Sequence, residues 1–411
     1  MMKKEIQAVL TNLKMTEPTL IQEKTRTPIL NGASCIALAK TGTGKTLAYA
    51  LPSLEKVAQG KPNSLVIIAP TTELAVQIRH AINPFIHALK LTGITLVGAG
   101  NRQRQEDNLK KKHPEVVVAT PGRFFDFFSA GRIKVDQIRT LVIDEADDVL
   151  EFNKMELLSS LGQNMTPDSQ ILLFGATESE ITQQAPEIFA RQFEKIDVRP
   201  DQKTTVKNYF LQIDNAHKID FIQRLLRLDG FKGILFFDSN QTMMRFAGIL
   251  AHTKTKFGIL ANDFGKQKRA AALNDFKVGK IKLLLATDLA ARGLDIAGVT
   301  YVVNYDIPSE ENTYLHRAGR TGRMGTTGYV VTLGDDHDLR DLRKLLGTKI
   351  KIARVYFAGF RLTEKLPQKK AQKNDSANKK AALIAKKKKH KKHKNKNKGY
   401  HPHYLKKKEQ K

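Results

Sequence analysis

Two acidic residues near position 144 follow a short apolar run. Asp144-Glu145-Ala146-Asp147 comes directly after Leu141-Val142-Ile143, a run typical of a buried parallel strand. Open α/β sheets bind their ligands beyond the carboxyl ends of the strands, so these carboxylates are expected to face a ligand. Asp144 would hold Mg²⁺, and Glu145 would orient or deprotonate an attacking water molecule.

A glycine-rich segment upstream has the spacing of a phosphate-binding loop. It runs Ala39-Lys-Thr-Gly-Thr-Gly-Lys45-Thr46, with Ala39 where the general pattern has its first glycine. The glycines let backbone N–H groups curl around phosphate oxygens, while the lysine would neutralise the β- and γ-phosphates and the last threonine would bind Mg²⁺. The predicted nucleotide-binding residues of this loop are Thr41, Gly42, Thr43, Gly44, Lys45 and Thr46. With Asp144 as the second predicted metal ligand, the two motifs predict an ATPase that needs Mg²⁺.

The charge of the chain is uneven. The 411 residues carry a net charge of +28, of which 365–411, with 19 lysines and 2 acids, contributes +17 and the rest +11. Such a basic segment favours a polyanionic partner, most often nucleic acid, although it could also be a merely solvated tail. Its low apolar content predicts disorder.

Other bulk features indicate where the chain works. Cys35 is the only cysteine, which excludes an intrachain disulfide and fits a reducing compartment. The sequence shows neither a signal peptide nor the roughly 20 apolar residues of a membrane helix. We therefore expect a cytoplasmic protein with no membrane partner.

The elements that position these motifs alternate between short apolar runs and longer amphipathic segments. Such alternation predicts an α/β fold with parallel sheets covered by helices. The predicted strands are 65–69, 115–119, 141–143, 171–174, 234–237, 281–286, 301–304 and 329–333. The predicted parts are an ATP-binding domain at 1–198, a linker at 199–206, a second domain at 207–347, a short extension at 348–364 and the basic RNA-binding tail at 365–411.

From about Lys14 to Gly328 the chain resembles the DEAD-box ATP-dependent RNA helicases. Besides the two motifs above, the resemblance rests on Pro70-Thr-Thr-Glu-Leu-Ala75, Ala119-Thr-Pro-Gly-Arg123, Gly175-Ala-Thr177, Ala286-Thr-Asp-Leu-Ala-Ala-Arg-Gly-Leu-Asp-Ile296 and His316-Arg-Ala-Gly-Arg-Thr-Gly-Arg323, in this order. The resemblance implies two tandem RecA-like domains that close around ATP and single-stranded RNA.

The resemblance also implies residue roles. Gln22, in Pro18-Thr-Leu-Ile-Gln22, would contact the adenine edge. Arg320 and Arg323 would act as arginine fingers on the γ-phosphoryl group. The ribose would be contacted by Gly293 and Asp295, and nucleotide state would be coupled to domain closure by Asp147, Gly175, Thr177 and the catalytic-set residue His316.

RNA would be held through its backbone, so that binding is largely independent of sequence. The positions that match the family's RNA contacts are Thr71, Gly98, Thr120, Gly122, Arg123 and Thr287. The chain departs from the family pattern at Thr72, where arginine is usual, at Gly175, where serine is usual, and at Met15, where an aromatic residue is usual. Gly175 removes a hydroxyl that would contact the region of Asp147.

We therefore expect an ATP- and Mg²⁺-dependent RNA helicase that opens short duplexes locally and remodels RNA–protein complexes, with ribosomal RNA or precursor particles among its substrates. Two other interpretations remain. An RNA clamp or annealing chaperone would be dominated by the tail, and a DNA-directed motor would share the ATPase core.

Overall fold

The computed structural model describes residues 2–149, 155–202, 205–214, 217–261, 264–291, 294, 296–322, 326–348 and 350–366. Two seven-stranded sheets lie within the unit Met1–Glu364. The predicted tail lies outside the described residues, apart from its first two. In the part of the chain that is described, no helix is long and apolar enough to cross a membrane.

All strand pairs of the first sheet are parallel, in the order β3-β4-β2-β5-β6-β1-β7. Its strands are β1 (Cys35–Leu38), β2 (Leu65–Ile68), β3 (Gly93–Leu96), β4 (Val116–Ala119), β5 (Thr140–Asp144), β6 (Gln170–Gly175) and β7 (Glu194–Asp197). Its helices are α1 (Lys4–Asn12), α2 (Leu20–Leu30), α3 (Lys45–Lys56), α4 (Thr72–Ala88), α5 (Arg102–Lys112), α6 (Pro121–Ser129), α7 (Ala146–Val149), α8 (Met155–Asn164), α9 (Glu180–Gln183) and α10 (Ala185–Ile188).

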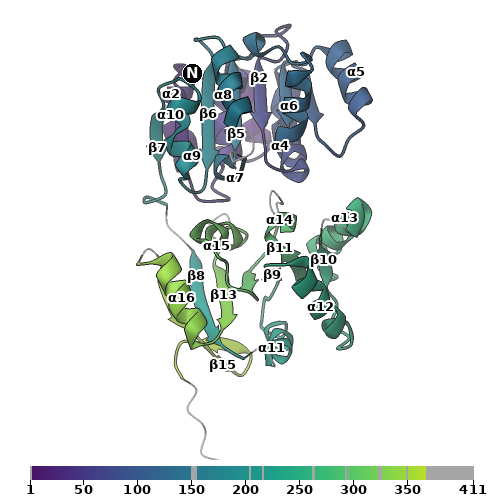
Figure 1. Ribbon diagram of the computed structural model, residues 1–411, viewed down its shortest axis with the longest axis vertical. Coiled ribbons are helices and arrows are strands. Elements are labelled where there is room, and N and C mark those ends of the chain that lie inside the picture. Colours follow the sequence, from purple (N-terminus) through teal and green to yellow (C-terminus); the bar gives the residue numbers. More distant parts are fainter. Residues whose placement is uncertain are drawn as a thin grey trace, which may run out of the picture. The chain divides into compact units, whose positions relative to one another are not determined.

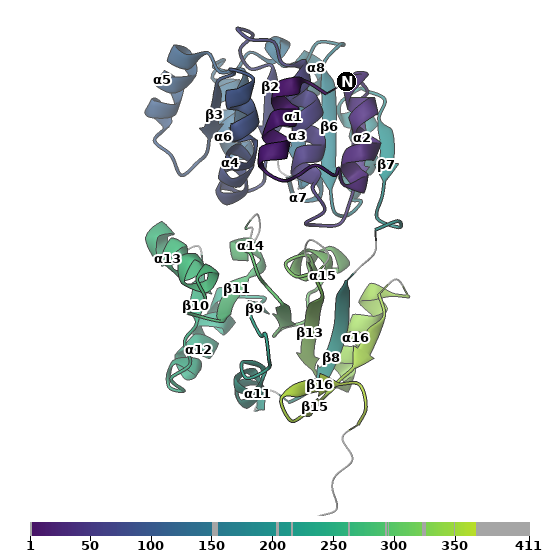
Figure 2. The same cartoon turned by 180° about the vertical axis from the view of Figure 1, so that it is seen from behind.

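The central strands are apolar throughout because helices cover both faces of the sheet. In β4, Val116 and Val118 pack toward α1–α4, while Val117 and Ala119 pack into a second core with α5, α6, α8 and α10. This split follows from the alternation of side chains along a strand. Figure 2 shows α1, α3 and α4 over one face, and Figure 1 shows α6 and α8 over the other.

The second sheet repeats this architecture in the order β10-β11-β9-β12-β13-β8-β14, again with all pairs parallel. Its strands are β8 (Val206–Gln212), β9 (Gly233–Phe237), β10 (Gly258–Leu260), β11 (Leu283–Thr287), β12 (Tyr301–Asn304), β13 (Gly328–Gly334) and β14 (Ile352–Arg354). Its helices are α11 (Lys218–Leu225), α12 (Asn240–Ala251), α13 (Gly265–Lys277), α14 (Asp288–Ala291), α15 (Glu311–Ala318) and α16 (Asp336–Leu346). The prediction of two tandem RecA-like sheets is confirmed.

Each of the eight predicted strands coincides with an observed strand to within a few residues. The sequence prediction missed β1, β3, β7, β8, β10 and β14. Most of these strands carry polar or half-exposed residues, but β1 is buried throughout. One edge strand comes from the predicted extension 348–364. There β14 pairs with β8, and the side chain of Val355 is 1% exposed. A hairpin of β15 (Tyr356–Ala358) and β16 (Arg361–Thr363) follows. Its Phe357 packs against Phe221 of α11, with the two ring centroids 4.8 Å apart.

Candidate active site

The phosphate-loop segment joins β1 to α3 at the carboxyl edge of the first sheet. Gly42 and Gly44 have φ angles of 75° and 94°, in the left-handed region that favours glycine. A Cβ on Gly44 would lie 2.7 Å from Nε2 of Gln22, so a side chain there would clash. Thr43 closes the turn by donating its hydroxyl to the Lys40 carbonyl at 2.6 Å. The loop thus delivers the N-terminus of α3, which attracts anions, to this edge.

Lys45 and Gln22 are both tied to this loop. Lys45 is 8% exposed, and its ammonium donates to the Ala39 carbonyl at 2.9 Å. Gln22 accepts from the Thr19 backbone N–H at 3.0 Å and donates to the Gly44 carbonyl at 3.2 Å. The residue predicted to read adenine therefore lies beside the residues predicted to hold phosphate.

The two predicted catalytic acids end β5 and begin the next turn. Asp144 is 3% exposed and accepts hydrogen bonds from the Tyr49 hydroxyl at 2.9 Å and from the Glu145 backbone N–H at 3.0 Å. Burial, reinforced by Glu145, raises the pKa of Asp144 to about 6, although Lys45 and Tyr49 oppose this shift. Glu145 has a positive φ of 48°, a rare conformation for this residue type that is typical of functional sites.

These acids fit a hydrated divalent cation. Oε2 of Glu145 is buried and has no hydrogen-bond partner among the described residues. A buried carboxylate oxygen without a donor is costly, and a water molecule held by a cation would supply one. Asp144 and Thr46 are the residues that would hold Mg²⁺, and they offer the oxygen ligands that this ion prefers.

Tyr49 is a site residue that sequence reasoning missed. It is fully buried on α3, makes an edge contact with Phe174 at 5.1 Å, and donates to Asp144. Tyr49 lies four residues after Lys45, so the two side chains share one face of the helix. This spacing is the signal in the sequence that could have identified Tyr49 as a site residue. Its partner Asp144 could not be predicted in this way, because the contact depends on the position of β5.

Asp147 is the centre of the predicted coupling set. Its Oδ2 accepts from the backbone N–H of Thr177 at 2.9 Å and from its hydroxyl at 2.5 Å, and Nε2 of His316 lies 3.3 Å away. Although burial raises the pKa of Asp147, the hydrogen bonds of His316 and Thr177 outweigh this effect and hold that pKa well below its usual range. A Cβ on Gly175 would lie 3.1 Å from Asp147 Oδ1, so all four predicted coupling residues are brought together.

Of the residues predicted as arginine fingers and ribose contacts, Arg320 is the one that lies among the described residues. Arg320 is 7% exposed and donates to the Leu294 carbonyl at 2.8 Å. Arg323, Gly293 and Asp295 lie outside the described residues. Arg317, to which no role was assigned from the sequence, is 1% exposed and binds the carboxylates of Asp288 and Asp238. Arg317 thereby ties α15 to the carboxyl ends of β11 and β9.

Five of the six predicted RNA contacts gather where β2, β3 and β4 end, and these three strands are neighbours in the sheet. Arg123 donates to the Gly98 carbonyl at 3.2 Å. A Cβ added at Gly98 or Gly122 would meet no described residue within 4 Å apart from its chain neighbours. Thr71 and Thr120 are the N-cap residues of α4 and α6. Thr287 ends β11 of the second sheet and is 9% exposed. Sequence reasoning missed Gln105, which contacts Arg123 at 3.3 Å.

Comparisons with known proteins agree with this arrangement. Residues 19–185 match the family model of the DEAD/DEAH box helicases, and residues 217–325 match the helicase conserved C-terminal domain. The chain is 36% identical over 355 residues to a probable ATP-dependent RNA helicase, YfmL, of Bacillus subtilis, which covers 85% of this chain and 93% of that protein. It is 33% identical over 360 residues to the DEAD-box ATP-dependent RNA helicase CshC of Bacillus cereus, covering 86% and 92%.

Solved structures with the same fold include two helicase complexes. S. cerevisiae Dbp5 bound to RNA and ADP BeF3 is 28% identical, with a TM-score of 0.76 over 86% of this chain and 94% of that one. Mss116p bound to ssRNA and AMP-PNP is 27% identical, with a TM-score of 0.75 over 87% and 78%.

Proposed function

Because the chain belongs to the DEAD-box family and is an RNA helicase that hydrolyses ATP, we propose that it uses Mg²⁺ and ATP to open short RNA duplexes locally and to remodel RNA–protein complexes. The observation that carries the proposal is the junction at the carboxyl edge of the first sheet. There the phosphate loop, which follows β1, and Asp144, which ends β5, lie on either side of β6.

Each residue contributes a separate part of the reaction. Lys45 binds and neutralises the phosphates, and Glu145 orients the attacking water and holds its proton on the buried Oε2. Mg²⁺, when bound by Thr46 and Asp144, supplies positive charge that neutralises the phosphate oxygens. Arg320 and Arg323 stabilise the charge that develops on the γ-phosphoryl group.

Coupling between hydrolysis and RNA runs through Asp147. Its bonds to Thr177 and its contact with His316 join β6 of the first sheet to α15 of the second. A change at the neighbouring Glu145 can therefore alter the contact between the two sheets. RNA held by Thr71, Gly98, Thr120, Gly122, Arg123 and Thr287 would be bent or released when that contact changes.

The substrate class is proposed from charge. The basic segment 365–411 carries +17 and would act as a sequence-independent anchor on large structured RNAs such as ribosomal precursors, in the cytoplasm. Deleting this segment is expected to weaken RNA binding and flatten its salt dependence. Unchanged affinity and salt slope in the shortened chain would contradict the anchor.

Steady-state ATP hydrolysis with and without RNA or DNA tests the core proposal, using wild type and Glu145→Gln. This substitution keeps the size of the side chain and removes the base. Stimulation by RNA that is lost in the variant supports the helicase. Absence of stimulation would favour an RNA clamp, and equal stimulation by DNA would favour a DNA-directed motor.

A further inference from the structure

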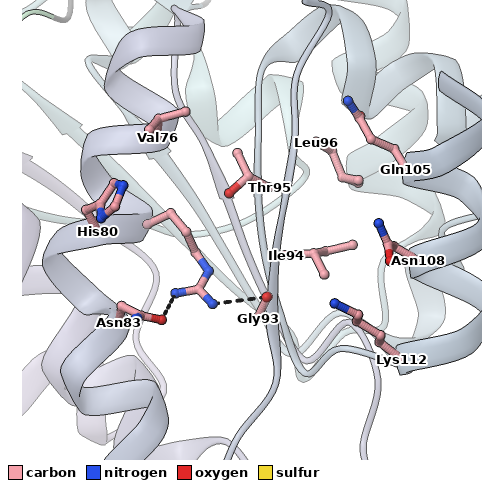
Figure 3. A pocket seen from close by; sticks show the side chains of 11 residues that line it. Val76, His80, Asn83, Gly93, Ile94, Thr95, Leu96, Gln105, Asn108 and Lys112 are labelled. Carbon is pink, nitrogen blue, oxygen red and sulfur yellow. Dashed lines mark hydrogen bonds between the residues drawn. The ribbon is translucent and has the colours of Figure 1, made fainter. Parts of the chain in front are cut away.

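A polar groove crosses the outer edge of the first sheet, away from the nucleotide-binding residues. It has a volume of about 380 Å³ and lies over β3, between α4 and α5. Figure 3 shows His80 and Asn83 on one wall and Gln105, Asn108 and Lys112 on the other. The Arg79 guanidinium lies against β3, because it donates to the Gly93 carbonyl. Since β3 is the edge strand of the sheet, no other strand among the described residues covers this side.

The lining of the groove is cationic and rich in amides. Arg79, Lys112 and His80 contribute positive or protonatable groups, and no aspartate or glutamate is among the described residues that line the groove. Within the described part of the chain, none of these three forms an ion pair. The other side of α5 differs, because Lys110 pairs with Glu106 at 2.8 Å and Arg102 pairs with Asp126 at 3.0 Å. The cations of the groove therefore keep their charge, whereas carboxylates neutralise the cations on the other side of α5.

The guanidinium of Arg79 is held in place at the floor of the groove. It donates to the Gly93 carbonyl at 3.0 Å and to Oδ1 of Asn83. A Cβ on Gly93 would lie 3.0 to 3.1 Å from the guanidinium atoms, so glycine provides the room for this contact. Burial lowers the pKa of Arg79, which is the effect of holding a cation without a carboxylate partner. An anionic ligand would offset that penalty.

The groove is continuous with the residues proposed to bind RNA. Gln105, which lines it, donates to the Val97 carbonyl at 3.0 Å and accepts from the Val97 N–H at 3.2 Å. Its amide oxygen also accepts from Arg123 at 3.3 Å, and Arg123 donates to the Gly98 carbonyl. One side chain thus belongs both to the end of the groove and to the proposed RNA set.

We propose that the groove over β3 binds a further stretch of the RNA strand, whose phosphates contact Arg79 and Lys112. The inference rests on the proposed RNA-binding role of Gly98 and Arg123, and it extends that track along the sheet edge. An acidic peptide added to β3 as an extra strand is the competing occupant. It is less favoured because Arg79 already occupies the Gly93 carbonyl that such a strand would need.

The test measures the affinity of the full chain for two oligouridylates. The short one is long enough only for the proposed RNA-binding residues around Gly98 and Arg123, and the long one also reaches the groove over β3. Arg79→Gln and Lys112→Gln each remove one cation. Lys24→Gln, on an exposed position of α2, makes the same charge change near β7 at the opposite edge of the sheet. Fluorescence anisotropy over a range of salt concentrations gives the affinity and its salt slope.

We expect each groove variant to weaken binding of the long RNA by up to about fivefold. The slope of log K against log salt should fall by about 0.7 for each lost phosphate contact. Lys24→Gln should leave the affinity for both RNAs near wild type, and Arg79→Gln and Lys112→Gln should not change the affinity for the short RNA. Gly93→Ala, which displaces the guanidinium, should reproduce Arg79→Gln.

Two results would overturn the inference. One is an equal affinity of wild type and both groove variants for the long RNA. The other is a loss of binding to poly-glutamate in the variants without any loss for RNA, which would assign the groove to an acidic peptide. Failure of the proposed function is distinguishable, because wild type would then show no RNA-stimulated hydrolysis even with the short RNA.

Discussion

Replacing Gly175 by serine should satisfy a buried carboxylate oxygen. Oδ1 of Asp147 is buried and accepts no hydrogen bond from the described residues, whereas Oδ2 accepts two from Thr177. A Cβ on Gly175 would lie 3.1 Å from this Oδ1 and 3.2 Å from the Thr177 carbonyl. A hydroxyl on that Cβ can reach hydrogen-bonding distance of Oδ1 once these two neighbours move slightly away from the Cβ.

The expected magnitude follows from two opposing contributions. A hydrogen bond to a charged group contributes about 1.5–3 kcal/mol to the free energy of unfolding. The added Cβ is closer than an ordinary contact, so its neighbours must shift, at a cost of about 1 kcal/mol. Gly175→Ala carries the steric cost without the hydrogen bond. We therefore expect the free energy of unfolding of Gly175→Ser to exceed that of Gly175→Ala by about 1.5–3 kcal/mol, which corresponds to roughly 3–12 °C in Tm.

Thermal and urea unfolding of wild type, Gly175→Ser and Gly175→Ala measure this difference. Repeating the pair in an Asp147→Asn background gives a double-mutant cycle, in which the advantage of serine should shrink because the charged acceptor is gone. Serine and alanine variants of equal stability would refute the argument, as would an advantage of serine that persists in full without the Asp147 carboxylate.

Three further predictions concern the active site and the second sheet. Since the pKa of Asp144 is raised to about 6, its ionised form destabilises the nucleotide-free fold above that pH. Asp144→Asn should therefore raise the free energy of unfolding at about pH 8 by roughly 2–3 kcal/mol, and urea titrations should show this gain vanishing as pH falls toward 4. Tyr49→Phe removes the donor to Asp144 and should raise the Mg²⁺ concentration needed for binding a fluorescent ATP analogue about tenfold, with metal-free binding unchanged; equal Mg²⁺ dependence would contradict it. A chain ending at Gly347 loses β14 and the buried Val355, so the free energy of unfolding of its second domain should be lower than that of a chain ending at Leu366 by at least roughly 1.5–3 kcal/mol, the contribution of a buried valine; urea unfolding of the two chains measures this, and equal stability would contradict it.

The central strands and the catalytic chemistry were predictable because their signals are local. Strands such as β4 and β5 are short apolar runs, because a strand covered by helices on both faces consists mainly of apolar residues. The edge strands β3 and β7 lack that signal, since one side of each meets solvent or polar side chains. The strand β14 was missed for the same reason, because it is three residues long and half-exposed.

By itself the sequence determined which chemistry is available. The spacing of Gly42, Gly44 and Lys45 and the pair of acids after an apolar run specify a phosphate loop and a carboxylate edge, because both depend on neighbouring residues. Only the tertiary structure decided which distant groups meet. Tyr49 reaches Asp144 across 95 positions, and His316 reaches Asp147 across 169. The unsatisfied oxygen beside Gly175 and the cationic groove at Arg79 likewise arise from strand order and helix packing, which no local pattern encodes.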